Sequence, residues 1–242
     1  MKQHFLPFFD ERNLPIDMLV LHCSNQPSDI MIDTLKKLSL SCHYIIDTDG
    51  TITQCVEEQN RAWHAGVGFW RKANTSINSR SIGIEISSPS LGQEAYPEAQ
   101  IQSLIKLSTD IIKRHKIPAH NIVGHSDIAP TRKADPGKAF PWQQLAQQGI
   151  GLWYSISDAK KIKTNDIEEL LHSIGYDTSN MQVTLASAYA FCRHFIPQFV
   201  EYDADVYHLV DNILPSNFDF INDSTFIQIL KAVSFAYQKK SS

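Results

Sequence analysis

The sequence predicts an α/β fold, in which helices flank a central mixed β-sheet, followed by a small all-α domain. Up to Tyr154, short apolar runs of β-forming residues alternate with helical patterns, which is typical of α/β domains. After Thr164, the apolar residues recur only at helical spacing. We therefore predict a first domain over residues 1–155, a linker over 156–163 and a helical domain over 164–242.

The composition is that of an ordinary globular protein. Of the 242 residues, 43% are hydrophobic and 20% are charged, and the formal net charge is -4. Because there is no basic excess, the sequence does not predict a nucleic-acid partner or binding to an anionic membrane. No transmembrane segment or signal peptide is visible. The literal sequence predicts a cytoplasmic protein; if a signal has been removed, the expected compartment is the periplasm or cell envelope.

The first half of the predicted sheet begins with an apolar run at residues 16–21. This run suits a buried central strand that presents His22 at its carboxyl end. A short helix is expected over 33–40. Two β-rich runs, 41–46 and 51–56, are separated by a turn that contains Asp-Gly, which is a strong hairpin signal.

The residues from 57 to 80 read as a long aromatic loop that suits a binding role better than a linker. The next strand, 81–86, places its three isoleucines on one face and Glu85 on the other. One explanation is that Glu85 is a solvent-facing residue of an antiparallel strand and has no functional role. A partly buried carboxylate beside a metal would instead have the raised pKa that a general base needs.

An amphipathic helix starts at Pro97 and is stopped by Pro118. A short strand at 121–124 follows and delivers His125, and a brief helix is expected over 142–148. The remaining segments are predicted to be helical, each with an apolar stripe or a terminating Gly or Pro: 167–173, 181–196, 204–214 and 224–237.

Charged residues gather after the strand that ends at His125. Lys133 and Asp135 are two positions apart in a segment whose prolines exclude a helix, so an extended chain would place both on one side. His22 and His125 both end apolar strands, and ligands in α/β folds gather at the carboxyl ends of strands. With Asp135 they form an N,N,O set that leaves a tetrahedral position open for water, as catalytic zinc requires. Two hydrogen-bonded strand-end histidines explain the same pattern about equally well.

Other residues compete for these roles. Asp127 is a rival carboxylate that could equally cap a turn. His43 is expected to be structural, and His64 is expected to contact substrate. The remaining helical histidines are expected to be solvated or half-buried: His115, His120, His172, His194 and His208. The four cysteines form no CxxC pair and are expected to be small buried hydrophobes: Cys23, Cys42, Cys55 and Cys192.

Successive motifs along the chain resemble those of one enzyme family. The stretches VLHCS, SCHYII, RAWHAG, INSRSIGIEI and GHSDIAPTRKADPGKAFPW are similar to the motifs of the AmpD/AmiD family of zinc-dependent N-acetylmuramoyl-L-alanine amidases. The resemblance covers residues 16–154. The shorter pieces LLHSIGYD and AFCRHFIP resemble the helical peptidoglycan-binding domain of the AmiD branch. This resemblance implies the type 2 amidase, or peptidoglycan recognition protein-like, fold.

The resemblance also implies roles for individual residues. The ligands of one catalytic zinc ion would be His22, His125 and Asp135, and the catalytic residues would be Glu85 and Lys133. The residues that would line the substrate groove are Trp63, His64 and Asn78. Two departures are Cys23, where AmpD-like members have asparagine, and Arg80, which is expected to alter the charge of the groove.

The implied reaction is hydrolysis of the amide between the lactyl group of N-acetylmuramic acid and L-alanine of the stem peptide, in peptidoglycan or muropeptides. The zinc-activated water would attack the lactyl carbonyl, with Glu85 as proton acceptor and Lys133 stabilising the oxyanion. The alternative is a non-catalytic peptidoglycan recognition module on the same fold. A pure binder would have no use for Glu85 and Lys133 beside a complete ligand set. The sequence carries no prediction of the oligomeric state.

Overall fold

The computed structural model describes residues 1–71, 76–200, 215 and 217–239. Its centre is a six-stranded mixed sheet in the order β1-β5-β4-β7-β3-β8. All neighbouring strands are parallel except β4 and β5, which form the predicted antiparallel hairpin. The strands are β1 Lys2–Gln3, β3 Met18–Ser24, β4 Tyr44–Ile46, β5 Ile52–Gln54, β7 Ser81–Ser87 and β8 Ile122–Gly124. The predicted mixed sheet is therefore confirmed.

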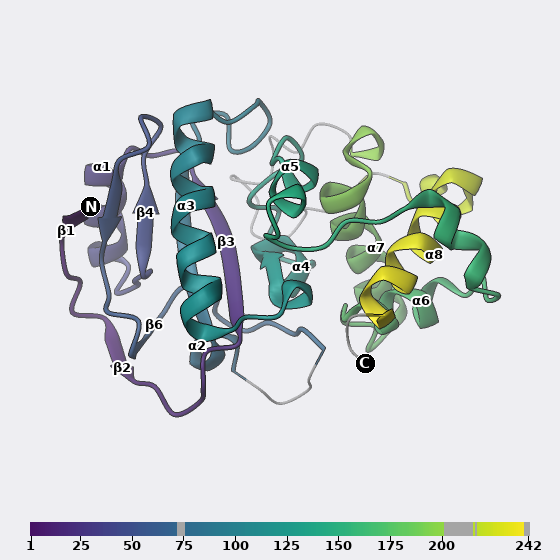
Figure 1. Ribbon diagram of the computed structural model, residues 1–242, viewed down its shortest axis with the longest axis horizontal. Helices are drawn as coiled ribbons and strands as arrows, with labels where there is room; N and C mark the ends of the chain where they lie inside the picture. Colours follow the sequence, from purple (N-terminus) through teal and green to yellow (C-terminus); the bar gives the residue numbers. More distant parts are fainter. Residues whose placement is uncertain (72–75, 201–214, 216, 240–242) are drawn as a thin grey trace.

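One face of the sheet is covered by α3 Glu98–His115, which lies along the strands β3 and β4 in Figure 1. Its buried residues pack on the side chains that β3, β4 and β7 direct to this face, including Leu19, Leu21 and the three isoleucines of β7. The helix begins after Pro97 and ends at Lys116, which is left-handed with φ 55°. This confirms the helix predicted from its apolar spacing.

The opposite face carries two separate apolar clusters. Beside β4 and β5, helix α1 Ser28–Lys37 packs Met31 and Ile32 against Ile45, Cys42 and Cys55. Beside β3 and β8, Met18, Val20 and Val123 pack together with residues of the C-terminal helices. Those helices gather beyond the β8 end of the sheet in Figure 1. The alternation along β3 thus sends Met18 and Val20 to one core and Leu19 and Leu21 to the other.

The remaining helices are short in the first part of the chain and longer in the second. They are α2 Ile77–Arg80, α4 His125–Ile128, α5 Trp142–Gln147, α6 Ile167–Ile174, α7 Met181–Phe195 and α8 Ser224–Lys239. Single 3-10 turns occur at η1 Ala119–Asn121, η2 Ile156–Lys161, η3 Pro197–Phe199 and η5 Asp219–Asn222. The predicted helices at 167–173, 181–196 and 224–237 are confirmed, whereas the one at 204–214 falls outside the described residues. Within the described ranges, no helix is both long and apolar enough to cross a bilayer.

Two sequence predictions need correction. The segment 57–80 is not wholly a loop, because β6 Asn60–Ala62 pairs antiparallel with β2 Phe9–Glu11 and α2 follows later. That pairing joins residues about fifty positions apart, which local patterns cannot reveal. Helix α1 starts at Ser28 rather than residue 33, because Pro27 provides an extended N-cap.

The segment predicted as a linker packs against the last helix. Within η2, the Lys161 Nζ lies 4.4 Å from the centre of the Phe235 ring of α8. The cysteines are all free and buried, which confirms their expected role as small hydrophobes: Cys23, Cys42, Cys55 and Cys192. The domain boundaries at residues 155 and 163 remain predictions.

Candidate active site

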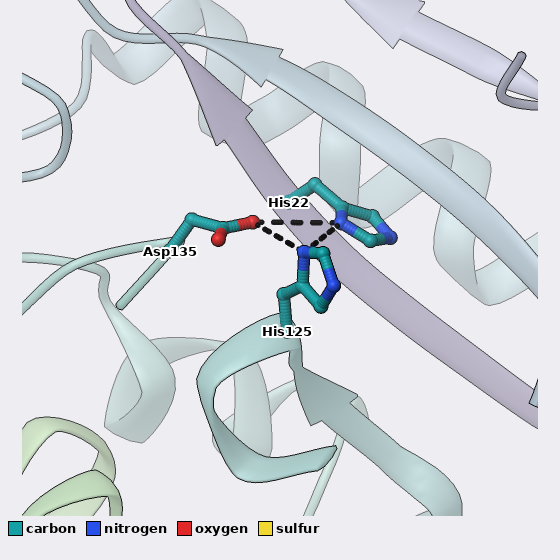
Figure 2. A group of neighbouring side chains, drawn as sticks. All are labelled: His22, His125 and Asp135. Carbon is teal, nitrogen blue, oxygen red and sulfur yellow. Dashed lines mark hydrogen bonds and ion pairs between the residues drawn. The ribbon is translucent and has the colours of Figure 1, made fainter. Parts of the chain in front are cut away.

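Three side chains that are distant in the sequence meet at the carboxyl end of the central strands. The Nδ1 atoms of His22 and His125 lie 2.9 Å apart, and Asp135 Oδ2 lies 3.1 Å from His125 Nδ1 and 3.4 Å from His22 Nδ1. Figure 2 shows the three polar atoms turned toward one point. All three residues are buried. The structure therefore brings the predicted ligand set together as a possible metal site.

The fold holds each of these residues in place. His22 lies in β3, whose neighbour β8 ends at Gly124 and passes directly into the α4 turn that begins with His125. Asp135 comes from the proline-rich segment, and its backbone carbonyl accepts a hydrogen bond of 2.9 Å from Ser126 N. Two parallel strand ends and one tethered turn segment thus supply the three groups.

A chain of hydrogen bonds decides which nitrogen of His22 carries the proton. Ser81 Oγ donates to the Ile77 carbonyl at 2.7 Å, so this hydroxyl accepts from His64 Nε2 at 3.1 Å. His64 Nδ1 is then the acceptor for His22 Nε2, which lies 2.9 Å away. The proton of His22 therefore sits on Nε2, and the lone pair of Nδ1 faces His125 and Asp135.

His125 is fixed in the same tautomer by a different partner. Its Nε2 lies 3.1 Å from the Ala65 carbonyl, which can only accept, so Nε2 carries the proton. Its Nδ1 lone pair therefore points at the Nδ1 lone pair of His22 and at the Asp135 carboxylate. Three electron-rich atoms in van der Waals contact repel one another unless a proton or a cation lies between them. The donor set is that of a cation site.

The pKa values fit this arrangement. Burial, together with the proximity of His125, lowers the pKa of His22 to about 4, which keeps its imidazole neutral at neutral pH. Burial alone would raise the pKa of Asp135, but His125 and His22 hold it well below its usual range. A neutral imidazole at His22 and an ionised carboxylate at Asp135 are the protonation states that metal binding requires.

Glu85 lies directly beside this group. It is the register partner of His22 on the adjacent strand β7, and its Oε1 is 4.0 Å from His22 Nδ1. Burial, reinforced by the negative charge of Asp135, raises its pKa to about 8. The Glu85 side chain is only 15% exposed. This excludes the alternative in which Glu85 is simply a solvent-facing strand residue without a function. The side chain faces the cavity that His125 and Asp135 also line.

That cavity has a volume of about 540 Å³ and combines a polar floor with an apolar wall. The floor includes His125, Asp135, Glu85 and Lys133. The wall is formed largely by α1 and the residues that follow it, namely Met31, Leu35, Leu38 and Leu40, with Trp63 and His64 also in the lining. Lys133 and Asp135 both line the cavity, as predicted, but the segment is not extended: Asp135 lies in a turn in which Gly137 N donates to the Ala134 carbonyl at 3.0 Å.

The three predicted groove residues have different surroundings. Trp63 lines the cavity, and its backbone N donates to Ser41 Oγ at 2.9 Å. His64 lines the cavity and also belongs to the hydrogen-bond chain behind His22. Asn78 Oδ1 accepts from the backbone N atoms of His64 and Ala65, at 3.3 and 2.8 Å, and so holds that loop. Their contacts with substrate remain predictions.

The competing residues are accounted for. Asp127 caps its own turn, since its Oδ2 accepts from Gly124 N at 2.7 Å, as the alternative for this residue anticipated. His43 is fully buried and accepts from Gly83 N, in agreement with its expected structural role. The expectation for His194 was wrong: it is 4% exposed and binds Asp127 at 2.9 Å, because α7 is buried against the first part of the chain.

The expectation that Arg80 alters the groove was also wrong. Its guanidinium is buried and binds both carboxylate oxygens of Asp17, at 2.6 and 2.7 Å. Two contributors to the site were not predicted from sequence. Ser81 completes the hydrogen-bond chain behind His22, and Arg132 donates to the carbonyls of Ala65 and Val67. Neither role has a local signal, because each depends on segments that fold together from a distance.

The chain is similar in sequence and in fold to known proteins. The family described as N-acetylmuramoyl-L-alanine amidase (Amidase_2) matches residues 12–138. The chain is 38% identical over 220 residues to the N-acetylmuramoyl-L-alanine amidase AmiD of Escherichia coli, with 78% of each chain covered. The chain belongs to the N-acetylmuramoyl-L-alanine amidase family. A second relative, the 1,6-anhydro-N-acetylmuramyl-L-alanine amidase AmpD of Enterobacter cloacae, is 42% identical over 108 residues, which cover 45% of this amidase and 56% of AmpD.

Solved structures extend the likeness to the C-terminal helices. The E. coli AmiD structure, a complex with the substrate anhydro-N-acetylmuramic acid-L-Ala-D-gamma-Glu-L-Lys, matches 93% of this amidase and 91% of that chain, with a TM-score of 0.73 and 33% identity. AmpDH3 of Pseudomonas aeruginosa matches 99% of this amidase and 96% of that chain, with a TM-score of 0.74 and 27% identity. These matches show the fold, including the additional helices at the C-terminus, and favour the catalytic interpretation over a non-catalytic recognition module.

Proposed function

We propose that this amidase binds one zinc ion through His22, His125 and Asp135. The ion would enable hydrolysis of the amide between the lactyl group of N-acetylmuramic acid and L-alanine of the stem peptide. The observation that carries the proposal is the convergence of two imidazole lone pairs and one carboxylate oxygen on a single point. Glu85 and Lys133 lie on the same polar floor of the cavity as His125 and Asp135, where a hydrolase needs a base and a cation.

The donor set fits zinc in number and spacing. Tetrahedral zinc with bonds of about 2.0–2.1 Å separates neighbouring ligand atoms by roughly 3.3 Å. The three separations among the Nδ1 atoms and Asp135 Oδ2 are 2.9, 3.1 and 3.4 Å, so only small shifts would be needed. Three protein ligands leave the fourth position for water or substrate, which is the pattern of catalytic rather than structural zinc sites.

Each remaining residue has a separate task. When bound, zinc supplies Lewis acidity, which polarises a carbonyl and lowers the pKa of water. Glu85 would accept the proton of the attacking water and return it to the amine of the leaving L-alanine. A nearby dication would also bring the raised pKa of Glu85 down toward neutrality, where a base works best. Lys133 would donate a hydrogen bond to the oxyanion that forms on the carbonyl oxygen of the lactyl group.

The substrate class follows from the relatives and from the shape of the cavity. The solved AmiD complex holds an anhydro-muropeptide, and a structure of AmpDH3 holds an anhydromuramic pentapeptide. The apolar wall formed by Leu35, Leu38 and Trp63 faces the polar floor and suits a ligand with a sugar ring or methyl groups on one side and amides on the other. Peptidoglycan or its soluble fragments are therefore the proposed substrates.

A direct test combines metal analysis with product analysis. The purified protein would be incubated with a defined muropeptide, with and without a zinc chelator, and the released peptide identified by mass spectrometry. We expect one zinc ion per chain and a free stem peptide that begins with L-alanine only when zinc is present. A control variant, His22→Ala, should lose both metal and product. Release of the peptide at an equal rate from metal-free protein would refute the proposal.

A further inference from the structure

A second buried cluster lies directly behind the metal-binding group and joins the two parts of the chain. Asp127, in the α4 turn, is only 1% exposed. Its Oδ1 accepts from the Tyr176 hydroxyl at 2.7 Å, and its Oδ2 lies 2.9 Å from His194 Nδ1. Tyr176 follows α6, and His194 lies in the last turn of α7, so both donors come from the C-terminal helices.

The α4 turn that carries Asp127 also controls two of the proposed zinc ligands. The turn begins with His125, and its Gly124 N donates to Asp127 Oδ2 at 2.7 Å. Ser126 N donates to the carbonyl of Asp135 at 2.9 Å. A shift of the turn would therefore displace the imidazole of one ligand and the backbone of the other.

The two donors are themselves held rigidly. The His194 ring stacks against Trp142, with centroids 3.9 Å apart and planes 14° apart, and against Phe195 at 4.0 Å and 13°. The Tyr176 ring is fully buried and meets Trp70 edge to face at 5.1 Å. Neither side chain is among the residues that line the cavity. Their contacts point to Asp127 rather than to substrate.

The energetics favour a dependence of the turn on these donors. When a buried carboxylate loses one of its hydrogen-bond donors, it is left partly unsatisfied, and this costs free energy because water cannot replace the donor. The least costly response is for Asp127 to move toward water or another donor, and this movement would pull the turn with it. Outer partners of metal ligands typically change metal affinity by about 10- to 100-fold when they are removed.

We infer that the C-terminal helices position the metal site of this amidase, with Tyr176 and His194 clamping Asp127 so that His125 and Asp135 are held ready for the ion. The inference rests on the proposed zinc site. It assigns the helical part a role in metal affinity that is separate from any contact with glycan. Tyr176 and His194 are positioning residues, because they act through the turn and not on the reacting atoms.

The test measures zinc affinity directly by competition with a chromogenic chelator, and the melting temperature of the metal-free protein in parallel. Tyr176→Phe removes one donor to Asp127 but keeps the ring. We expect it to weaken zinc binding by about 10- to 100-fold. The matched control is Tyr189→Phe, which removes a hydroxyl from α7 in the same core, where the ring packs on Arg193 and Phe220. The control should keep the affinity of the parent protein.

A pair of substitutions at position 194 separates positioning from packing. His194→Leu removes the donor, whereas His194→Asn loses the same stacking area but places an amide donor near the former Nδ1. Zinc affinity should fall in the leucine variant and recover in part in the asparagine variant. If the leucine variant does not fold, the tyrosine pair still decides the question.

Two outcomes are distinguishable. Equal zinc affinity in the parent protein, Tyr176→Phe and both position-194 variants, even with lower melting temperatures, would overturn the positioning role and leave the proposed function intact. A parent protein that binds no zinc would instead refute the proposed function itself.

Discussion

At the scale of single residues, the chemistry of the site depends on where two protons sit. Ser81 and the Ala65 carbonyl each fix a histidine with its proton on Nε2, through His64 in one case and directly in the other. Both Nδ1 lone pairs are thereby aimed at one point. These groups orient the proposed zinc ligands without belonging to the ligand set themselves.

This hydrogen-bond chain leads to a first prediction. In Ser81→Ala, His64 Nε2 loses its acceptor and its tautomer is no longer fixed. A flipped tautomer of His64 would place the proton of His22 on Nδ1, where it competes with the metal. We expect zinc affinity to fall about tenfold, measured by chelator competition.

The control for this change is Ser108→Ala on α3. Ser108 is also fully buried, and its Oγ has no hydrogen-bond partner within the part of the chain that the structure describes. Its removal should leave zinc affinity unchanged. If the two serine variants bind zinc equally well, the chain through His64 does not set the tautomer.

Lys133 carries a second prediction. Its side chain lines the cavity but is not part of the group of three proposed ligands. Lys133→Ala should therefore retain one zinc per chain while turnover of a muropeptide falls by about 100- to 1000-fold, since one donor to the oxyanion is lost. Lys113→Ala, on the far helix α3, serves as the control. Undiminished turnover in Lys133→Ala would remove this residue from the mechanism.

Local patterns made His22 and His125 candidate ligands because each ends an apolar run, but the same patterns explained two hydrogen-bonded histidines equally well. The resemblance to the amidase family was needed to select these two histidines and Asp135 as the ligand set. The role of Asp127 toward the C-terminal helices could not be predicted in this way. It depends on Tyr176 and His194, which are 49 and 67 positions away.

At the scale of elements, the same division between local and distant signals holds. Helix α3 and strands β3 and β7 were predictable because their apolar spacing is strong and continuous. The pairing of β2 with β6 was missed because Arg61 and Asn60 give β6 no apolar alternation. That short ribbon is stabilised instead by the ion pair between Arg61 and Asp10.

An ion cluster between elements gives a third prediction. Glu58, just before β6, accepts from the Tyr44 hydroxyl of β4 at 2.7 Å and from Arg114 Nη2 of α3 at 2.8 Å, and it also lies 2.6 Å from His115 Nε2. Burial opposes its ionisation, but the hydrogen bonds from Arg114, His115 and Tyr44 lower its pKa to about 2, from an ordinary 4.5. A lowered pKa means that the ionised form stabilises the fold.

This stabilisation should be complete above pH 4.5 and should be lost as the pH falls toward 2, where the folded protein also takes up the proton. Glu58→Gln should lower the free energy of unfolding by about 1.5–3 kcal/mol at neutral pH, with the difference shrinking in acid. Denaturant titrations across this range would measure it, with Glu57→Gln as an exposed neighbour for comparison. Parallel pH profiles for the parent protein and Glu58→Gln would contradict the assignment.

At the scale of the whole molecule, the two parts of the chain share a core. One continuous cluster contains Val20 and Val123 of the sheet together with Leu171, Phe191 and Leu230 of the C-terminal helices. The composition and patterning along the chain suggested two units, because strands stop and helices take over near residue 155. Such patterns predict the individual helices and strands, but they do not predict which faces of these elements pack against one another. The clamp on Asp127 lies in the same contact region.

A shared core leads to the last prediction, that the described parts unfold together. Leu171 of α6 is fully buried in the common cluster, so Leu171→Ala should cost about 2–5 kcal/mol. The sheet loses packing partners if α6 unfolds. The substitution should therefore lower the temperature of one cooperative unfolding transition, and the helices should not unfold before the sheet. Calorimetry of the metal-free protein would show a single peak at reduced temperature, with calorimetric and van't Hoff enthalpies in agreement. Leu38→Ala, at a position that is 61% exposed, should change the melting temperature little. Two separate peaks in Leu171→Ala would mean that the helices form an independent domain. If zinc affinity were then unchanged at temperatures above the first peak, the metal site would not depend on the helices.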